Sequence, residues 1–206
     1  MIRTENLTKR YANDFVALDN LTMEIRKGEI FGYVGPNGAG KTTTIRILCG
    51  LLKPTSGKAF IGDHDISGNL RKLRRLTGYL PDVFGVYEEM RVWEYLDFFG
   101  ACFRIPRRKR RKRIDEVLHI TRSDAMRDYF VDTLSHGMRQ RIGIAKTLMH
   151  DPEVLFLDEP TNGLDPRARI EMRSFIKELA DLGKTILVSS HILPELASIC
   201  DRVGIL

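Results

Sequence analysis

The eight residues GPNGAGKT at positions 35–42 constrain the fold of this chain more than any other stretch. They fit the pattern G-x-x-x-x-G-K-[ST], and they follow the apolar run Ile30–Val34, which is typical of a short buried strand. A glycine-rich turn that opens a helix points several backbone N–H groups at an anion and adds the partial positive charge of the helix N-terminus. The pattern predicts a nucleoside-triphosphate site in which Lys41 reaches the β- and γ-phosphates, Thr42 binds Mg²⁺ and Thr43 donates to the α-phosphate.

Two acidic residues stand side by side in the stretch FLDEPTNGLDP, residues 156–166. Asp158 and Glu159 directly follow the apolar run 154–157, so they come at the end of a buried strand, where neighbouring carboxylates repel each other and lose solvation. Because side chains alternate across a strand, the two acids face different surroundings. We expect Asp158 to lie next to the Mg²⁺ of the phosphate loop and Glu159 to face a water in line with the γ-phosphate.

The rest of the pattern alternates between strands and helices at both ends of the chain. Residues 2–7 and 17–25 resemble a small antiparallel sheet, and the segment from about 83 to 150 is mostly helical. We therefore expect an α/β fold with a mostly parallel sheet covered by helices and a helical insert between its halves. Further expected strands are 59–61, 78–80, 154–157, 185–189 and 203–206, and expected helices are 41–51, 92–103, 137–149, 167–182 and 192–200. The last strand reaches the end of the sequence, which leaves a C-terminal continuation open.

The positive charge of the chain is concentrated in one stretch. The formal net charge is +6, and residues 107–113, RRKRRKR, carry seven positive charges, so removing them from the balance leaves −1. Ile114, Val117 and Leu118 follow at helical spacing, and we interpret the run as the solvated start of an amphipathic helix. Contact with anionic lipid or an acidic partner is the alternative. No aromatic residues interleave with the basic ones, so nucleic acid is not an expected partner.

Nothing in the sequence predicts a membrane span or secretion. No apolar run approaches the roughly 18 residues that cross a bilayer, and the N-terminus lacks the apolar core of a signal peptide. Cys49, Cys102 and Cys200 are odd in number, lie far apart and match no metal-ligand spacing. We expect a cytoplasmic protein whose three cysteines are small buried thiols in a reducing compartment.

Taken together and in this order, the motifs closely resemble those of the nucleotide-binding subunits of ABC transporters, over essentially the whole chain. GPNGAGKT matches the Walker A motif of that family, and the acidic pair after residue 157 matches Walker B. LSHGMRQR at 134–141 lies where the family has its LSGGQ signature, at a helix N-terminus. GLDP at 163–166 matches the D-loop, and His191 matches the switch histidine that contacts the γ-phosphate.

The resemblance implies one ABC ATPase domain over residues 1–206, built as a P-loop NTPase with a RecA-like core. Residues 1–82 and 151–206 would form the ATP-binding core with an N-terminal antiparallel β-subdomain, and 83–150 the helical subdomain that carries the signature. The implied cofactors are ATP and Mg²⁺. The implied catalytic residues are Glu159, which polarises water, His191 and Lys41, and the implied metal-binding residues are Thr42, Asp158 and Asp82. The implied nucleotide-binding residues are Tyr11, which would stack on adenine, Val16, Gly35, Asn37, Gly38, Ala39, Gly40, Lys41, Thr42, Thr43, Ser135 and Gly137.

Two positions depart from the family pattern. Asp82 stands where the family usually has the Q-loop glutamine; its carboxylate can still bind Mg²⁺ or orient water, but it adds negative charge to the site. His136 replaces a signature glycine, whereas Ser135 and Gly137, the positions that would donate to the γ-phosphate of a second subunit, are retained. We therefore expect a head-to-tail homodimer in which each ATP lies between the Walker motifs of one copy and the signature of the other.

The chain most resembles the ATPases of ABC-2-type exporters, including multidrug-type ones. That implies a separate integral-membrane permease, which holds the ATPase at the cytoplasmic face of the cell membrane. The family docks its permease on the helical insert and on the segment 82–93, where the candidate apolar anchors are Phe84, Val86, Tyr87 and Trp93. Two other functions stay open: a soluble ABC ATPase that acts on nucleic acid or ribosomes, and a nucleotide-gated regulatory subunit with little hydrolysis, which the two departures make conceivable.

Overall fold

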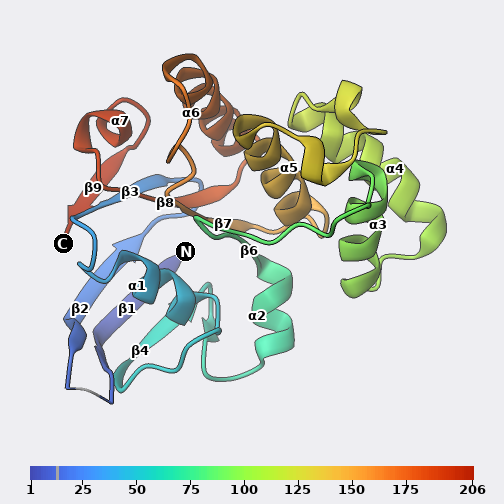
Figure 1. Cartoon of the computed structure of the whole chain (residues 1–206). Coiled ribbons are helices and arrows are strands. Elements are labelled where there is room, and N and C mark those ends of the chain that lie inside the picture. Colours follow the sequence, from blue (N-terminus) through green and yellow to red (C-terminus); the bar gives the residue numbers. More distant parts are fainter. Residues whose placement is uncertain (13) are drawn as a thin grey trace.

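The computed structural model of the chain describes residues 1–12 and 14–206. Its centre is a five-stranded sheet with the order β6-β7-β8-β3-β9, in which neighbouring strands pair in parallel. The strands are β3 (Ile30–Val34), β6 (Thr77–Leu80), β7 (Val154–Asp158), β8 (Thr185–Ser190) and β9 (Arg202–Ile205). Every residue of β3, β7 and β8 is buried, because other elements cover both faces of the sheet (Figure 1).

A second, antiparallel sheet has the order β2-β1-β4-β5. Its strands are β1 (Ile2–Arg10), β2 (Val16–Ile25), β4 (Ser56–Ile61) and β5 (His64–Asp65). Its buried side chains form one cluster with those of α1 (Lys41–Leu48) and with Phe31, Tyr33 and Phe156 of the parallel sheet. Helix α1 contacts β2 and β4 of the antiparallel sheet and β7 of the parallel sheet, so it is anchored to both (Figure 1).

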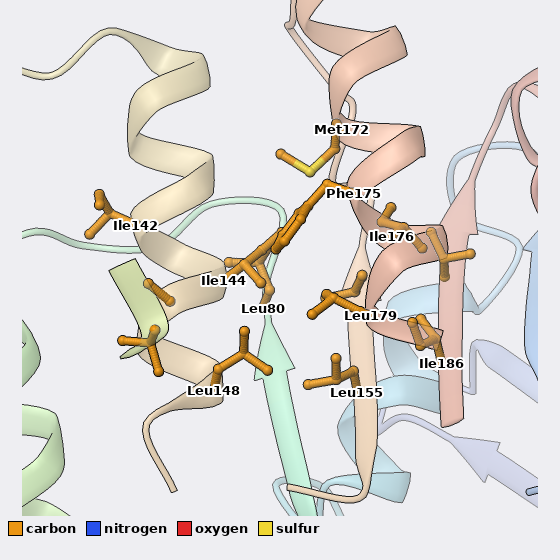
Figure 2. Close-up of a cluster of buried hydrophobic side chains, with 14 of the residues drawn as sticks. Leu80, Ile142, Ile144, Leu148, Leu155, Met172, Phe175, Ile176, Leu179 and Ile186 are labelled. Atoms are coloured by element: carbon orange, nitrogen blue, oxygen red, sulfur yellow. The ribbon is translucent and has the colours of Figure 1, made fainter. Parts of the chain in front are cut away.

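The helical segment between the halves of the parallel sheet shares a core with that sheet. It contains α3 (Val92–Cys102), α4 (Arg107–Ile120) and α5 (His136–Leu148), with the short turns η1 (Asp124–Met126) and η2 (Val131–Thr133). Figure 2 shows Ile144 and Leu148 of α5 facing Phe175 and Leu179 of α6 (Pro166–Asp181), with Leu155 of β7 beneath them. This packing fixes the start of α5, and with it residues 135–137, relative to the sheet.

The structure confirms the parallel sheet, the antiparallel N-terminal sheet and the helical insert; the boundaries of the insert at residues 83 and 150 stay a prediction. Helix α2 (Leu70–Leu76) and strand β5 were not predicted. The sequence of α2 is mostly charged, and it is held by the burial of Leu73 and by the Asn69 side chain, which accepts a hydrogen bond from the backbone of Lys72.

Two helices are shorter than expected. The first ends at Leu48 rather than residue 51, because Gly50 takes a left-handed conformation with φ of 67° and ends the helix. The last, α7 (Leu193–Ala197), covers only the middle of the expected 192–200.

The cysteines only partly follow expectation. Cys49 is buried and Cys200 is half-buried, but Cys102 is exposed at the last position of α3, so the expectation of three buried thiols is wrong for that residue. All three are free thiols. Among the described residues, no helix has both the length and the apolar character needed to cross a membrane.

Candidate nucleotide-binding site

The phosphate loop connects β3 to α1 through backbone conformations that favour glycine. Gly38 and Gly40 have φ of 87° and 98°, in the left-handed region. A Cβ atom on Gly40 would lie 2.3 Å from the carbonyl oxygen of Ala17, so a side chain there would collide with β2 as well as strain the backbone. The glycines thus allow the loop to pass close to the antiparallel sheet and to turn into α1 at Lys41.

Lys41 is almost completely buried at the start of α1, with 6% of its surface exposed. Its Nζ donates to the carbonyl oxygens of Gly35 at 2.6 Å and Pro36 at 3.1 Å, and it lies 3.3 Å from Oε1 of Glu159. A buried ammonium at the positive end of a helix is unfavourable by itself, so these three contacts are what hold it there. The lysine of the phosphate loop is thereby in direct contact with the second acid of the Walker B pair.

The two Walker B acids have different surroundings, as expected, but Glu159 lies just beyond the end of β7, so alternation along the strand is not what separates them. Oδ1 of Asp158 accepts a hydrogen bond of 2.7 Å from Ser189 on the neighbouring strand β8. Oε2 of Glu159 lies 2.9 Å from Nδ1 of His191, and the Glu159 backbone N–H donates to Ser189 Oγ at 3.0 Å. Glu159 has a φ of 49°, a left-handed conformation that is uncommon outside glycine.

The other oxygen of Asp158 fits a bound cation. Asp158 is 1% exposed, and its Oδ2 has no hydrogen-bond partner within the part of the chain that the structure describes. A buried carboxylate oxygen without a partner is costly unless a cation completes it. The Asp158 carboxylate also affects a neighbouring thiol. Burial raises the pKa of Cys49 well above its usual range, and the negative charge of Asp158 raises that pKa further. The donor set, one carboxylate with the hydroxyl of half-buried Thr42 on α1, fits the oxygen preference of Mg²⁺, which also takes phosphate and water oxygens.

Side chains alone do not form a closed metal site. Among the described residues, no group of three or more His, Cys, Asp or Glu side chains is arranged to hold a metal ion. Asp82, an expected metal ligand, instead accepts a hydrogen bond of 3.1 Å from Nδ2 of Asn162. The structure therefore brings Asp82 to Asn162, the residue before the D-loop, and the role of Asp82 at the metal stays a prediction.

Tyr11 lies beside the phosphate helix, at the base of the loop between β1 and β2. Its hydroxyl is 3.4 Å from Oγ1 of Thr43, and its ring is stacked with that of Phe15, with 6.4 Å between the ring centroids and 24° between the ring planes. Tyr11 and Val16 are 37% and 39% exposed, and Phe15 is 50% exposed. Three apolar side chains are thus presented at the edge of the phosphate loop, where a base could stack on a ring.

The signature residues lie on a different surface from the phosphate loop. Ser135 caps the N-terminus of α5, where its Oγ accepts a hydrogen bond of 3.3 Å from the backbone of Met138. Next to it, a pocket of about 430 Å³ opens between the start of α5 and residues 163–165 of the D-loop. Among the described residues, no hydrogen bond or ion pair joins Ser135 or Gly137 to Lys41, Asp158, Glu159 or His191. The structure thus assembles the Walker residues and His191 in one place and leaves the signature exposed in another.

The two departures from the family pattern meet at one residue. Nε2 of His136 donates a hydrogen bond of 2.9 Å to the carbonyl oxygen of Asn162, while the Asn162 side chain donates to Asp82. Asn162 is thus held between the segment after β6 and the start of α5. We call this arrangement the Asp82–Asn162–His136 bridge.

A family model described as ABC transporter matches residues 18–162 of the chain. The chain belongs to the ABC transporter family. The bacitracin transport ATP-binding protein BcrA of Bacillus licheniformis is 42% identical over 207 residues, which cover 100% of this chain and 66% of BcrA. The probable multidrug ABC transporter ATP-binding protein YbhF of Escherichia coli (strain K12) is 38% identical over 205 residues, which cover 100% of this chain and 35% of YbhF. The chain therefore spans about one third to two thirds of the length of these curated relatives.

Solved ABC cassettes share the fold of this chain. The structure of cbiO1 from Clostridium perfringens, part of the ABC transporter complex cbiONQ, is 31% identical with a TM-score of 0.88 and covers 99% of this chain and 83% of cbiO1. A dimeric structure of the bacterial cassette MJ0796 is 27% identical with a TM-score of 0.88 and covers 100% of this chain and 94% of that one. A second dimeric structure of MJ0796, in a post-hydrolysis state bound to ADP and Pi, has a TM-score of 0.89 at 26% identity over the same shares of the two chains. These likenesses confirm the expected P-loop NTPase fold.

Three residues of this ABC cassette were missed by sequence reasoning. Ser189 binds both Walker B acids, and its position opposite Asp158 follows from the pairing of two strands that lie far apart in the sequence. Asn162 forms hydrogen bonds with both Asp82 and His136, the two residues that depart from the family pattern. Phe15 was the easiest of the three to predict. An aromatic residue in a polar turn beside a predicted strand is expected to be exposed, and an exposed aromatic side chain suggests a binding role.

Proposed function

We propose that this chain binds and hydrolyses ATP as the nucleotide-binding unit of an ABC transporter. The observation that supports it most directly is the continuous set of contacts Lys41–Glu159–His191 beside the buried Oδ2 of Asp158, which has no hydrogen-bond partner among the described residues. If these residues formed only a structural ion pair, a buried Asp158 Oδ2 without a partner would serve no purpose. A triphosphate with its cation would complete each of these groups.

The roles follow from the chemistry of each side chain. Phosphate oxygens replace the carbonyl and carboxylate contacts of Lys41, whose charge then stabilises the negative charge that develops on the γ-phosphate. Glu159 accepts a hydrogen bond from the attacking water, and His191 orients that carboxylate or the γ-phosphate. Asp158 and Thr42 would hold Mg²⁺, which would supply positive charge to neutralise the phosphate oxygens. The rings of Tyr11 and Phe15 offer a stacking surface for the base.

We also propose that two copies associate head to tail around two nucleotides. Ser135 and the backbone of Gly137 lie at an exposed helix N-terminus, where N–H groups and the helix dipole favour an anion. Since no described contact brings them to the phosphate loop of their own chain, a second copy can supply that loop. The cassette MJ0796, to which this chain is similar, has been solved as a dimer.

The partner we propose is an integral-membrane permease, which places the ATPase at the cytoplasmic face of the membrane. Of the expected anchors, Phe84, Val86 and Trp93 pack partly against the core, whereas Tyr87 is 49% exposed. A mainly apolar groove of about 240 Å³ opens nearby. Its apolar lining residues include Leu51, Tyr79, Phe99 and Phe103. We assign permease docking to this groove together with Tyr87. Relatives with names such as bacitracin transport and multidrug transporter make an exporter the preferred class.

The test is hydrolysis of Mg-ATP by the wild-type protein and by Glu159→Gln, with Glu153→Gln as a charge-matched control on an exposed side chain. We expect Glu159→Gln to lower turnover about a hundredfold to ten-thousandfold. The variant retains ATP binding and accumulates as a dimer in light scattering, and the control behaves like the wild type. Full turnover by Glu159→Gln would refute the assigned role. Wild-type protein that binds ATP without hydrolysing it would support the nucleotide-gated regulatory subunit.

A further inference from the structure

A basic groove of about 970 Å³ lies outside the nucleotide site, between α2, the end of α3, the start of α4 and the residues that follow α5. These elements lie on one side of the molecule (Figure 1), at some distance along the chain from one another. The cations that line the groove are Arg75, Arg108, Lys109, Lys112 and Arg113, and the acids are Glu116 and Asp151. We refer to it below as the α2–α4 groove.

The basic run 107–113 divides into structural and unpaired residues. Arg110 binds Asp97 at 2.6 Å, and Arg113 donates to the carbonyl oxygens of Leu148 and Met149 at 2.5 and 3.2 Å. These two arginines therefore hold α4 to α3 and to the end of α5.

Three cations of the α2–α4 groove are left without a partner. Arg75, Arg108 and Lys109 make no side-chain hydrogen bond or ion pair to any residue that the structure describes, and all three are exposed. Of the two acids, Glu116 is paired with Lys112 and Arg113, and Asp151 with Arg113 and Lys184. The groove therefore carries positive charge that the protein itself does not neutralise.

The position of these charges is unfavourable for the helix that carries them. Arg108 and Lys109 stand in the first turn of α4, which has no acidic residue and no side-chain cap. Positive charges at a helix N-terminus are repelled by the helix dipole, so local stability does not explain their presence. A bound anion would remove this repulsion.

The apolar residues of the groove indicate which anion fits. Phe103 and Ile105, both half-buried, line it beside the cations. An amphiphile with a phosphate head matches this combination, whereas a nucleic-acid strand would be expected to use a longer basic track with stacking aromatics. We propose that the α2–α4 groove binds the phosphate head group of an anionic phospholipid at a membrane surface. This binding is independent of nucleotide and does not rest on the ATPase assignment.

The test uses two variants with the same loss of charge from the same two helices. Arg75→Gln/Arg108→Gln removes two groove cations, and Arg71→Gln/Arg111→Gln removes two exposed cations of α2 and α4 that do not line the groove. Binding to vesicles of phosphatidylcholine and phosphatidylglycerol in equal parts is measured by cosedimentation at low salt, beside vesicles of phosphatidylcholine alone. A basic residue near an anionic surface contributes about fivefold to binding, so the groove variant should bind about 25-fold more weakly. The control should lose no more than about threefold, because its charges act only at long range.

Three other outcomes would overturn the proposal. Equal losses in the two variants would show attraction by the whole surface without a groove. Binding of inorganic phosphate at the same groove without binding to vesicles would assign it to a free anion. Tighter binding to a single-stranded oligonucleotide than to the vesicles, lost in the groove variant, would assign it to nucleic acid. Unchanged thermal unfolding of both variants confirms that neither result reflects a loss of structure.

Discussion

His150 should make the stability of this protein fall in mild acid. The residue follows α5, and its ring is stacked on Phe103 with 3.7 Å between the ring centroids. Nε2 donates a hydrogen bond of 2.9 Å to the carbonyl oxygen of Thr77, so the neutral ring carries its proton on Nε2. Nδ1 is buried and has no partner among the described residues, so a second proton there would be a buried charge without an acceptor.

The size of the effect follows from the pKa. Burial lowers the pKa of His150 from 6.5 to about 4, and the positive charges of Arg113 and Lys184 also lower it. Protons therefore bind more readily to the unfolded chain. The contribution of neutral His150 to the unfolding free energy is fully present above pH 6.5 and is lost as the pH falls toward 4. A shift of this size corresponds to about 3 kcal/mol of unfolding free energy at 1.36 kcal/mol per unit.

The test is the variant His150→Phe, which keeps the ring stack and removes the titrating group. At pH 8 we expect it to be about 1 kcal/mol less stable than the wild type, because the Thr77 carbonyl loses its hydrogen bond. At pH 4.5 the order should reverse, with the variant more stable by about 1–2 kcal/mol. Urea unfolding followed by the fluorescence of Trp93, the single tryptophan, measures both values. His119→Gln, on a side chain 85% exposed, should follow the wild type. A difference between His150→Phe and wild type that stays constant with pH would refute the argument.

Three further predictions concern the nucleotide site. Lys41→Ala should weaken Mg-ATP binding, measured by calorimetry, about a hundredfold, because a buried charge-assisted contact to phosphate is lost. An unchanged affinity would refute the assignment of residues 35–42 as a phosphate loop. Asp82→Ala and His136→Ala should each lower ATP turnover about threefold to tenfold, and the double variant little more than either one, because both act through the same asparagine; independent effects would multiply instead. Gly40→Ala should cost about 2 kcal/mol or more in unfolding free energy, because its Cβ would strike β2; a melting temperature equal to that of the wild type would contradict the loop geometry.

The elements that sequence reasoning found are those with strong local signals. β3 and β7 are continuous apolar runs next to a glycine-rich turn or an acidic pair, and both lie within a residue of their expected bounds. α2 lacks such a signal, because one buried leucine among four basic residues forms no apolar face. The exposure of Cys102 could not be predicted either, since it depends on which side of α3 faces α4 and α5.

The candidate site shows the same division. Lys41, Asp158, Glu159 and His191 were expected from their motifs, and the parallel register of β7 and β8 brings the last three together. The contacts of Asp82 could not be predicted, because Asn162 is 80 residues away in sequence and reaches it only through the position of the D-loop. Motifs thus predicted which residues meet near the phosphate, and tertiary packing decided what surrounds them.

We propose that the pairing of Lys41 with Glu159 couples the carboxylate to nucleotide binding. Lys41 Nζ donates to the carbonyl oxygen of Gly35 in its own loop and lies 3.3 Å from Oε1 of Glu159, so the two charges are paired. Removing one partner from a buried ion pair costs about 3–5 kcal/mol, which only another buried charge of the right sign can offset. In this proposal the triphosphate would replace Glu159 as the anionic partner of Lys41, and His191, whose Nδ1 lies 2.9 Å from Oε2, would be left as the partner of the carboxylate. The proposal predicts that the Lys41–Glu159 contact and the binding of a triphosphate exclude each other.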